Sequence, residues 1–327
     1  MNRIKIPNLA QIIKWIILAV VLVLLINYII QHIHEFSFLK DIRVEYLIPV
    51  ILLNIFVLLL SCYRFDMLLT HISHRIPRYT VFKYFIFGRF INKFIPYGGS
   101  IYRAIMFKKS DGVSYKNYIA SNASFDWLNL IYSTLLGIAV ISFYDPQLKI
   151  QSAPLLPIFI GAHLVFILTI PLAKKVLARI NRSLFDGSFR KRTREMAEIV
   201  DRVIDALRNR PIFFRNSIII TLIIGSNLIS FNFLFKSIGM DTDLVVLLVY
   251  LIILRFFKAM RITPANLGIR EFLLGFLSYS MGTGAAEGIA VSIMMRLITL
   301  SVQGSLSLGL FAGEGTFRFL RSKKSRE

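Results

Sequence analysis

Long apolar runs separated by short polar segments make up most of the chain. Runs of this length predict transmembrane helices, because about 20 apolar residues in a helix cover the roughly 30 Å hydrocarbon core of a bilayer. The sixth and seventh runs are short and interrupted. The pattern therefore predicts an all-α polytopic membrane protein with about eight transmembrane helices, at residues 15–31, 46–63, 120–143, 154–173, 214–235, 243–257, 267–282 and 289–312.

One stretch between the second and third spans does not suit a helix that faces lipid. Residues 89–103, RFINKFIPYGGSIYR, combine cations with a proline and two glycines inside an apolar neighbourhood. Proline removes a backbone donor and glycine weakens a helix, so the freed backbone groups must face protein or water. We therefore predict a re-entrant or broken helix whose breaks are Pro96, Gly98 and Gly99.

A similar stretch recurs in the second half of the chain. Residues 255–270, RFFKAMRITPANLGIR, again contain Arg-Phe, a lysine, a proline, a glycine and a final arginine. Paired segments interrupted by glycine and proline in two halves of a hydrophobic chain point to a transporter-type site. The recurrence is either an internal repeat, with halves at approximately 1–173 and 211–317, or a coincidence of spacing. In the repeat interpretation the second break lies at Pro264 and Gly268.

The positions of lysine and arginine predict the orientation of the spans. The basic residues gather at alternate ends of the apolar runs, which places both termini on the cytoplasmic side of the plasma membrane. The stretch 80–107 has basic residues on both flanks, as expected if it does not cross the membrane.

The basic segment 174–210 joins the two halves. Its apolar residues recur every three or four positions, which predicts a cytoplasmic amphipathic helix, with a solvated connector as the alternative.

The composition excludes a soluble protein. The chain of 327 residues is 56% hydrophobic, and its net charge of +21 comes from 39 Lys and Arg against 18 Asp and Glu. In a soluble protein this charge would suggest nucleic acid, but here the basic residues lie between apolar runs and meet anionic lipid headgroups. The single cysteine, Cys62, excludes an internal disulfide. No spacing suggests a metal site or an ATP-binding loop, so neither a cofactor nor a metal is expected.

Ionisable side chains in the apolar neighbourhood are the strongest candidates for function, because each costs roughly 2.5–3.5 kcal/mol at the centre of a membrane helix. The alternatives are structural. Asp126 and Arg296 would pair with each other and fix helix packing, and Arg270 and Glu271 would form a pair at the headgroups. No catalytic residue is predicted. The candidate substrate-binding residues are Arg89, Lys93, Arg103, Asn122, Asp126, Arg270, Glu271 and Arg296.

Four segments in this order resemble a known family. PYGGSIYR (96–103), ASNASFDWLNL (120–130), TPANLGIRE (263–271) and GTGAAEGIAVSIMMRLITL (282–300) resemble the lysylphosphatidylglycerol synthase transmembrane region family. This family is the flippase portion of multiple-peptide-resistance-type proteins and their stand-alone relatives. The resemblance covers nearly the whole chain. It implies re-entrant helices and the movement of lipids or lipid-linked glycans between leaflets.

Two residues depart from the family pattern and leave the substrate open. Trp127 stands where an arginine beside an acidic residue is frequent, and Asn266 stands where a glycine is common. The lysine-transferring activity of the family belongs to a separate soluble domain, which is expected to be absent here. The resemblance therefore does not imply an enzyme.

The sequence as a whole predicts a flippase-like protein that moves a phospholipid, an aminoacyl-phospholipid or a lipid-linked glycan without ATP. Arg103, Arg270 and Arg296 would bind phosphate oxygens, and Asp126 and Glu271 would balance charge or contact an amine or a sugar hydroxyl. The alternatives are an accessory membrane subunit of a lipid-modifying glycosyltransferase and a membrane-embedded transferase. The expected partners are membrane lipids with anionic or zwitterionic headgroups, a lipid-modifying enzyme and a second copy of the chain, but not nucleic acid.

Overall fold

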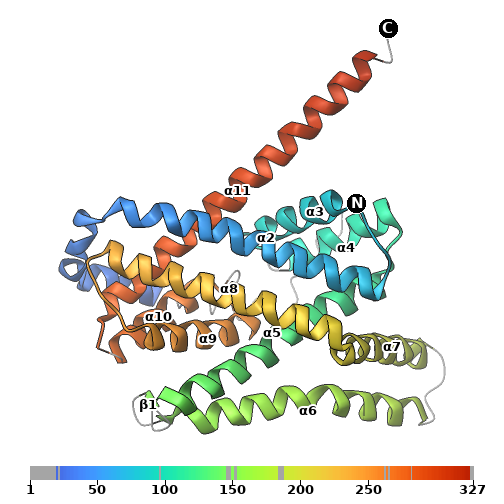
Figure 1. Cartoon of the computed structure of the whole chain (residues 1–327), viewed down its shortest axis with the longest axis horizontal. Helices are drawn as coiled ribbons and strands as arrows, with labels where there is room; N and C mark the ends of the chain where they lie inside the picture. Colours follow the sequence, from blue (N-terminus) through green and yellow to red (C-terminus); the bar gives the residue numbers. More distant parts are fainter. Residues whose placement is uncertain are drawn as a thin grey trace.

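Helices that follow the apolar runs lie alongside one another in a bundle, as a computed structural model of the chain shows (Figure 1). The structure describes residues 20, 23–95, 97–144, 149–150, 153–182, 188–260, 263, 266–280 and 282–324. Five of its helices contain a stretch long and apolar enough to cross a membrane. They are α2 (Leu47–Ile72), α5 (Tyr115–Tyr144), α6 (Leu155–Arg182), α8 (Arg210–Ser237) and α11 (Ala285–Lys324).

These five helices correspond to the predicted second, third, fourth, fifth and eighth spans, and the prediction of an all-α polytopic membrane protein is confirmed. The first predicted span lies partly outside the described residues, and its described residues 20 and 23–31 are helical. Helix α2 extends well beyond the predicted end at residue 63. The reason is that Arg64, the first charge after the apolar run, is itself buried and hydrogen-bonded inside the bundle.

Two pairs of shorter helices form hairpins: α3 (Arg78–Ile91) with α4 (Gly98–Asp111), and α9 (Leu244–Met260) with α10 (Ile269–Ser280). They contain 14, 14, 17 and 12 residues. At 1.5 Å per residue these helices are about 18–26 Å long, which is less than the roughly 30 Å hydrocarbon core. The number of full crossings, predicted as about eight, therefore stays a prediction.

The two hairpins enter the bundle from opposite ends (Figure 1). At one end, His74 before α3 hydrogen-bonds the carbonyl of Asp111 at the end of α4, at 2.9 Å. At the other end, Tyr144 at the end of α5 donates to Asp243, just before α9, at 3.0 Å. This arrangement matches the prediction of two broken segments. Pro96 and Pro264, two of the predicted breaks, lie outside the described residues.

Helix α7 (Ser188–Arg208) lies across the end of the bundle that contains His74. It packs on α5 and α6 and buries Val203 and Ala206. Lys116 on α5 contacts Glu198 at 3.1 Å. The segment predicted as an amphipathic helix therefore forms one and rests on the bundle.

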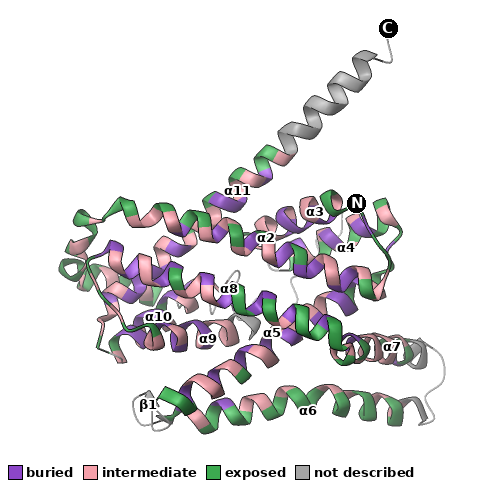
Figure 2. Cartoon of the chain, in the orientation of Figure 1, coloured by how far each residue is buried: buried purple, intermediate pink, exposed green. Residues whose placement is uncertain are grey.

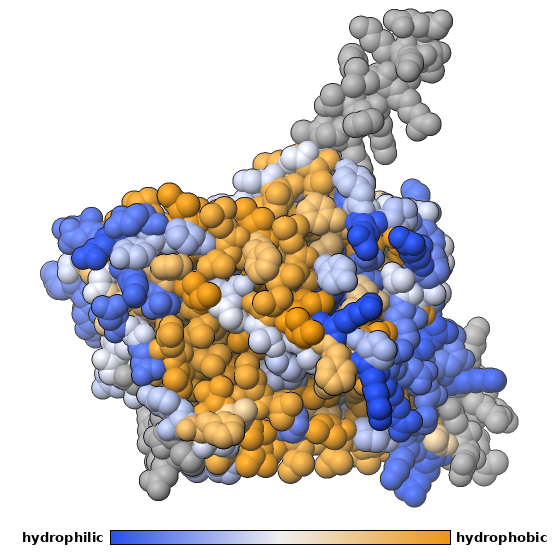
Figure 3. Space-filling model, in the orientation of Figure 1, coloured by the Kyte–Doolittle hydropathy of each residue, from blue (hydrophilic) through white to orange (hydrophobic). Residues whose placement is uncertain are grey.

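The opposite end carries the small elements. There η1 (Ile33–Asp41) and η2 (Val44–Tyr46) precede α2, and β1 (Lys149–Ile150) pairs with β2 (Ala153–Pro154) in an antiparallel ladder. Hydrophilic residues gather at both ends of the molecule, and apolar residues cover the broad region between them (Figure 3). This is the surface expected of a bundle that crosses a bilayer.

Two apolar cores hold the hairpins in place. Aromatic residues dominate the core around α3 and α4, where Phe65 of α2 packs with Phe85 and Phe107. The second core joins α8, α9 and α10, and it centres on Tyr250 and Leu274. Both cores include residues of α2 and α11, so these two helices connect the hairpins. Buried residues concentrate along these contacts, whereas α6 is largely exposed (Figure 2).

Candidate functional site

The first hairpin is closed by direct contact between two glycines. A Cβ on Gly99 would overlap the carbonyl oxygen of Gly88, so α3 and α4 approach backbone to backbone at this point. Asn92 in the turn accepts a hydrogen bond from the Gly99 amide at 2.8 Å. Gly98 and Gly99 are the first two residues of α4, and Tyr97 before them has a left-handed φ of 61°. The predicted glycine positions thus lie at the junction between turn and helix.

Arg103 lies against this glycine contact and is 6% exposed. Its guanidinium is surrounded by the rings of Phe65, Phe85 and Tyr118, at 5.1, 5.3 and 5.9 Å from the ring centroids. It donates to the side-chain oxygen of Asn122 on α5 at 3.4 Å. The hydrogen bond to Asn122 is long, and the aromatic rings carry no negative charge that would neutralise the guanidinium. Arg103 therefore keeps its capacity to attract an anion.

Asn122 in turn donates to Asp126, one helical turn further along α5, at 3.4 Å. The structure therefore brings together three of the predicted residues, Arg103, Asn122 and Asp126. Asp126 is also close enough to Arg64 and Arg89 for the charges to interact.

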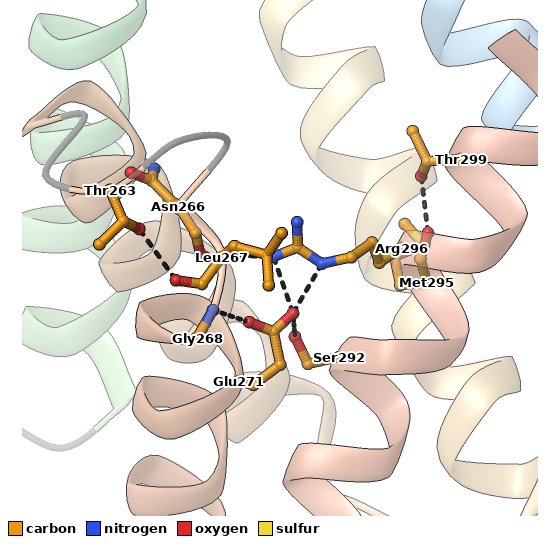
Figure 4. Close-up of polar contacts among 9 residues, drawn as sticks. All are labelled: Thr263, Asn266, Leu267, Gly268, Glu271, Ser292, Met295, Arg296 and Thr299. Atoms are coloured by element: carbon orange, nitrogen blue, oxygen red, sulfur yellow. Dashed lines mark hydrogen bonds and ion pairs between the residues drawn. The ribbon is translucent and has the colours of Figure 1, made fainter. Parts of the chain in front are cut away.

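The second hairpin turns through Asn266 and Gly268, which have positive φ angles of 51° and 78°. Glu271 accepts a hydrogen bond from the Gly268 amide at 2.8 Å and so caps the start of α10 (Figure 4). This is the contact that the acidic residue of a capping box makes. Gly268 therefore serves as the predicted break, and Glu271 holds the helix that follows it.

Glu271 is buried, and its ion-pair partner is Arg296 on α11. Two guanidinium nitrogens of Arg296 contact the same carboxylate oxygen at 2.7 and 2.8 Å, and Ser292 lies beside it at 3.5 Å (Figure 4). Arg296 also donates to the carbonyl of Asn266 at 3.3 Å. The structural alternative, in which Glu271 pairs with its neighbour Arg270 at the headgroups, does not describe this site, because the α10–α11 contact takes the carboxylate into the protein interior and pairs it with Arg296.

Two further arginines belong to the site but were not among the predicted residues. Arg64 is 1% exposed, lies 4.0 Å from the centroid of the Phe125 ring, and donates to Asn216 and to the backbone carbonyl of Phe125. Arg255 on α9 donates to Asn129 on α5 at 2.9 Å. Arg255 opens the recurring stretch, so its position in that pattern was the signal for it. No comparable pattern indicated Arg64, because it follows residue 63, where the second span was predicted to end.

Lys93 in the first turn connects the two hairpins. Its ammonium is close enough to interact with the charges of Arg89 in its own hairpin, Arg270 at the start of α10 and Arg296 on α11. A contact between α3 and α11 supports this placement, since a Cβ on Gly304 would meet the Phe90 ring at 3.3 Å. The charges of the two recurring stretches are therefore close enough to interact across the bundle.

Together these groups form a connected set of charges, which we call the cation cluster. Among the side chains that the structure describes, seven cations interact within it, and two carboxylates, Asp126 and Glu271, are linked to them. A buried excess of positive charge is costly unless an anion or water compensates it. The cations are Arg64, Arg89, Lys93, Arg103, Arg255, Arg270 and Arg296.

A family model described as the lysylphosphatidylglycerol synthase TM region matches residues 11–306. The chain belongs to this family. No curated protein and no solved structure matches it.

Membership in the lysylphosphatidylglycerol synthase TM region family relates the protein to lipid modification and translocation. The match includes both hairpins and the start of α11, and therefore the whole cation cluster. A site of this composition can bind a phosphate or another anion, because guanidinium groups donate paired hydrogen bonds to such oxygens.

Proposed function

We propose that the protein moves a lipid with a phosphate-bearing headgroup between the leaflets, without ATP, and that the cation cluster holds the headgroup in transit. The observation that carries this proposal is the excess of positive charge in the cation cluster, in which Arg64 and Arg103 are buried and the other cations are partly buried. A bound phosphate would offset this charge inside the hydrocarbon region, where water is scarce. The phospholipid, aminoacyl-phospholipid and lipid-linked glycan classes all supply such a group.

Within this proposal the cations of the cluster have different roles. Arg296 is already paired with Glu271, so it shapes the site and supports the turn at Asn266. The charge of Lys93 interacts with those of Arg89, Arg270 and Arg296, and the charge of Arg270 interacts with those of Arg296 and Glu271. We assign the contact with the phosphate to Arg270 and Lys93.

We further propose that the chain is an integral protein of the cytoplasmic membrane, with the end that carries α7 facing the cytoplasm. The support for this orientation is the concentration of lysine and arginine at that end, which follows the positive-inside rule. We also propose that the protein changes the position of the lipid and not its covalent structure. Membrane lipids are then its main partners.

The test is translocation of a fluorescent phospholipid in proteoliposomes that contain only the purified protein. Replacing Arg270 or Lys93 by glutamine should slow translocation about tenfold or more, because a hydrogen bond to a charged group contributes about 1.5–3 kcal/mol. Arg270→Lys should restore part of the rate, since lysine keeps the charge but loses the two-bond fork. Arg210→Gln, at the exposed start of α8, is the matched control and should have no effect.

The melting temperature of each variant distinguishes a role of the residue in lipid binding from a role in packing. Removing Arg270 or Lys93 from a cluster of like charges relieves repulsion, so these variants should melt at the same temperature as the wild type or above it. Destabilised variants would assign the residues to structure. Wild-type protein that moves no lipid would support the accessory-subunit alternative, and covalent modification of the added lipid would support the transferase alternative.

A further inference from the structure

One side of α5 carries a row of polar residues, although the helix is apolar enough to cross a membrane. Asn122, Asp126, Asn129 and Ser133 are separated by four, three and four positions, so they lie on the same face of the helix. With a rise of 1.5 Å per residue, they extend over about 16 Å of the helix axis. This is about half of the hydrocarbon thickness. We call these four residues the α5 stripe.

The α5 stripe touches both hairpins. At one end Asn122 accepts from Arg103 of the first hairpin at 3.4 Å. Further along, Asn129 accepts from Arg255 of the second hairpin at 2.9 Å. Asp126 lies between the two asparagines. The stripe therefore joins the cations of the two halves along a single helix face.

Ser133, at the far end of the stripe, has a buried hydroxyl that is not satisfied. It is 3% exposed, and in the described part of the structure its Oγ has no hydrogen-bond partner. A serine in a helix can donate to the carbonyl four residues earlier, as the neighbouring Thr134 does to Leu130 at 3.0 Å. A buried polar group without a partner costs about 1–3 kcal/mol. The hydroxyl can therefore donate to a polar group that reaches this position.

An apolar contact closes the stripe immediately beyond Ser133. The next position on this face is Gly137, where a Cβ would meet the Phe159 ring at 2.7 Å and Ile252 at 3.3 Å. Phe159 and Ile252 belong to an apolar cluster with Ile141. The polar face therefore begins beside Arg103 and ends at a seal between α5, α6 and α9.

We infer that the α5 stripe is the track along which the phosphate of the headgroup passes from one hairpin to the other, with Phe159 and Ile252 as the closed gate at its far end. The inference rests on the proposed function and specifies its path. Arg103 and Arg255 attract the phosphate, and the side chains of Asn122, Asn129 and Ser133 donate hydrogen bonds to it. Asp126 repels it, which keeps binding weak enough for release.

Cysteine accessibility tests the track without requiring lipid movement. In a Cys62→Ser background, single cysteines replace Asn122, Asn129 or Ser133, and Leu128 serves as the matched control because it is 1% exposed on the same helix. Each variant is placed in phosphatidylcholine nanodiscs and treated with anionic sulfonatoethyl methanethiosulfonate or with its cationic trimethylammonium counterpart. The anionic reagent should modify the stripe about tenfold faster than the control and faster than the cationic reagent, because Arg103 and Arg255 beside the stripe attract anions and repel cations.

Two further experiments test the identity of the ligand and the position of the gate. A short-chain phosphatidic acid should protect the stripe cysteines at a concentration where inorganic phosphate does not; equal protection by inorganic phosphate would overturn the assignment to a lipid headgroup. Phe159→Ala should raise reactivity at the Ser133 position and leave it unchanged at the Asn122 position.

Each outcome bears separately on the track and on the proposed function. Stripe cysteines that react no faster than the Leu128 position would overturn the track, even if the protein moves lipid. Ser133→Cys keeps the test valid if the asparagine variants fold poorly, since among the described residues the serine hydroxyl has no hydrogen-bond partner to lose. Reactive stripe cysteines in a protein that moves no lipid would overturn the proposed function instead and leave a hydrated anion site.

Discussion

Replacing Glu271 by glutamine removes the negative charge of the Arg296 ion pair while preserving the shape of the side chain. The amide oxygen of glutamine can still accept from the Gly268 amide, so the cap of α10 is retained. Arg296 then stays partly buried without its carboxylate. Removing one partner of a buried ion pair costs about 3–5 kcal/mol. The Arg296 side chain is 19% exposed, against 3% for Glu271, and we therefore expect the lower end of that range.

A double-mutant cycle isolates the pair from other effects. Arg296→Gln alone leaves Glu271 as a buried charge, and it should destabilise the protein by a similar amount. The double variant contains two neutral amides that can bond each other, so its loss should be smaller than the sum by about 1–3 kcal/mol. Glu195→Gln is the control, because Glu195 lies 3.7 Å from Lys116 with 40% of its side chain exposed. An exposed pair of this kind contributes at most about 1 kcal/mol.

The measurement is reversible unfolding in mixed micelles of a mild detergent and dodecyl sulfate, followed by circular dichroism. Additive losses for Glu271→Gln and Arg296→Gln would refute the reasoning, because they would mean that the 2.7 Å contact carries no coupling energy. The same cycle reports on function. Since we assign Arg296 to the support of the turn, any loss of lipid movement in these variants should follow their loss of stability.

Two further predictions concern packing and orientation. Gly99→Ala should destabilise the protein by about 1–3 kcal/mol in a melting experiment, because the new methyl group overlaps a backbone carbonyl of α3, whereas Gly161→Ala, which meets open space, should stabilise α6 slightly. Equal effects would contradict the close contact of α3 and α4. In a cysteine-free background, an impermeant thiol reagent should label Asp241→Cys in intact cells and Ser110→Cys only after permeabilisation. The reverse labelling would invert the proposed orientation.

Much of the architecture follows from patterns that span many residues. Apolar runs give the positions of the long helices, since the bilayer imposes one length and one polarity on every crossing. The two broken segments were also predictable, because arginine, lysine, proline and glycine together suit neither lipid nor a regular helix. The recurring stretch at 255–270 correctly marked the second hairpin, whose charges interact with Lys93 of the first one.

The partners of individual charges were not predictable, because pairing depends on how helices far apart in the sequence pack. Glu271 follows Arg270 in the chain, yet it binds Arg296, 25 positions later. Arg64 and Asn216 are separated by 152 positions and meet only because α2 packs along α8. The sequence shows which charged residues are costly to bury. The tertiary packing determines which partner compensates each charge.

The last described helix completes contacts that begin near the start of the fold. Thr299 on α11 accepts a hydrogen bond from Asn54 on α2 at 3.0 Å, and Arg296 on the same helix supplies the counter-charge for Glu271. Both cores also include residues of α11. During synthesis, the α9–α10 hairpin therefore carries a carboxylate without its ion-pair partner Arg296 until α11 has left the ribosome. We expect the second hairpin to insert stably into the bilayer only at that stage. A chain truncated before residue 296 should therefore be degraded by membrane quality control.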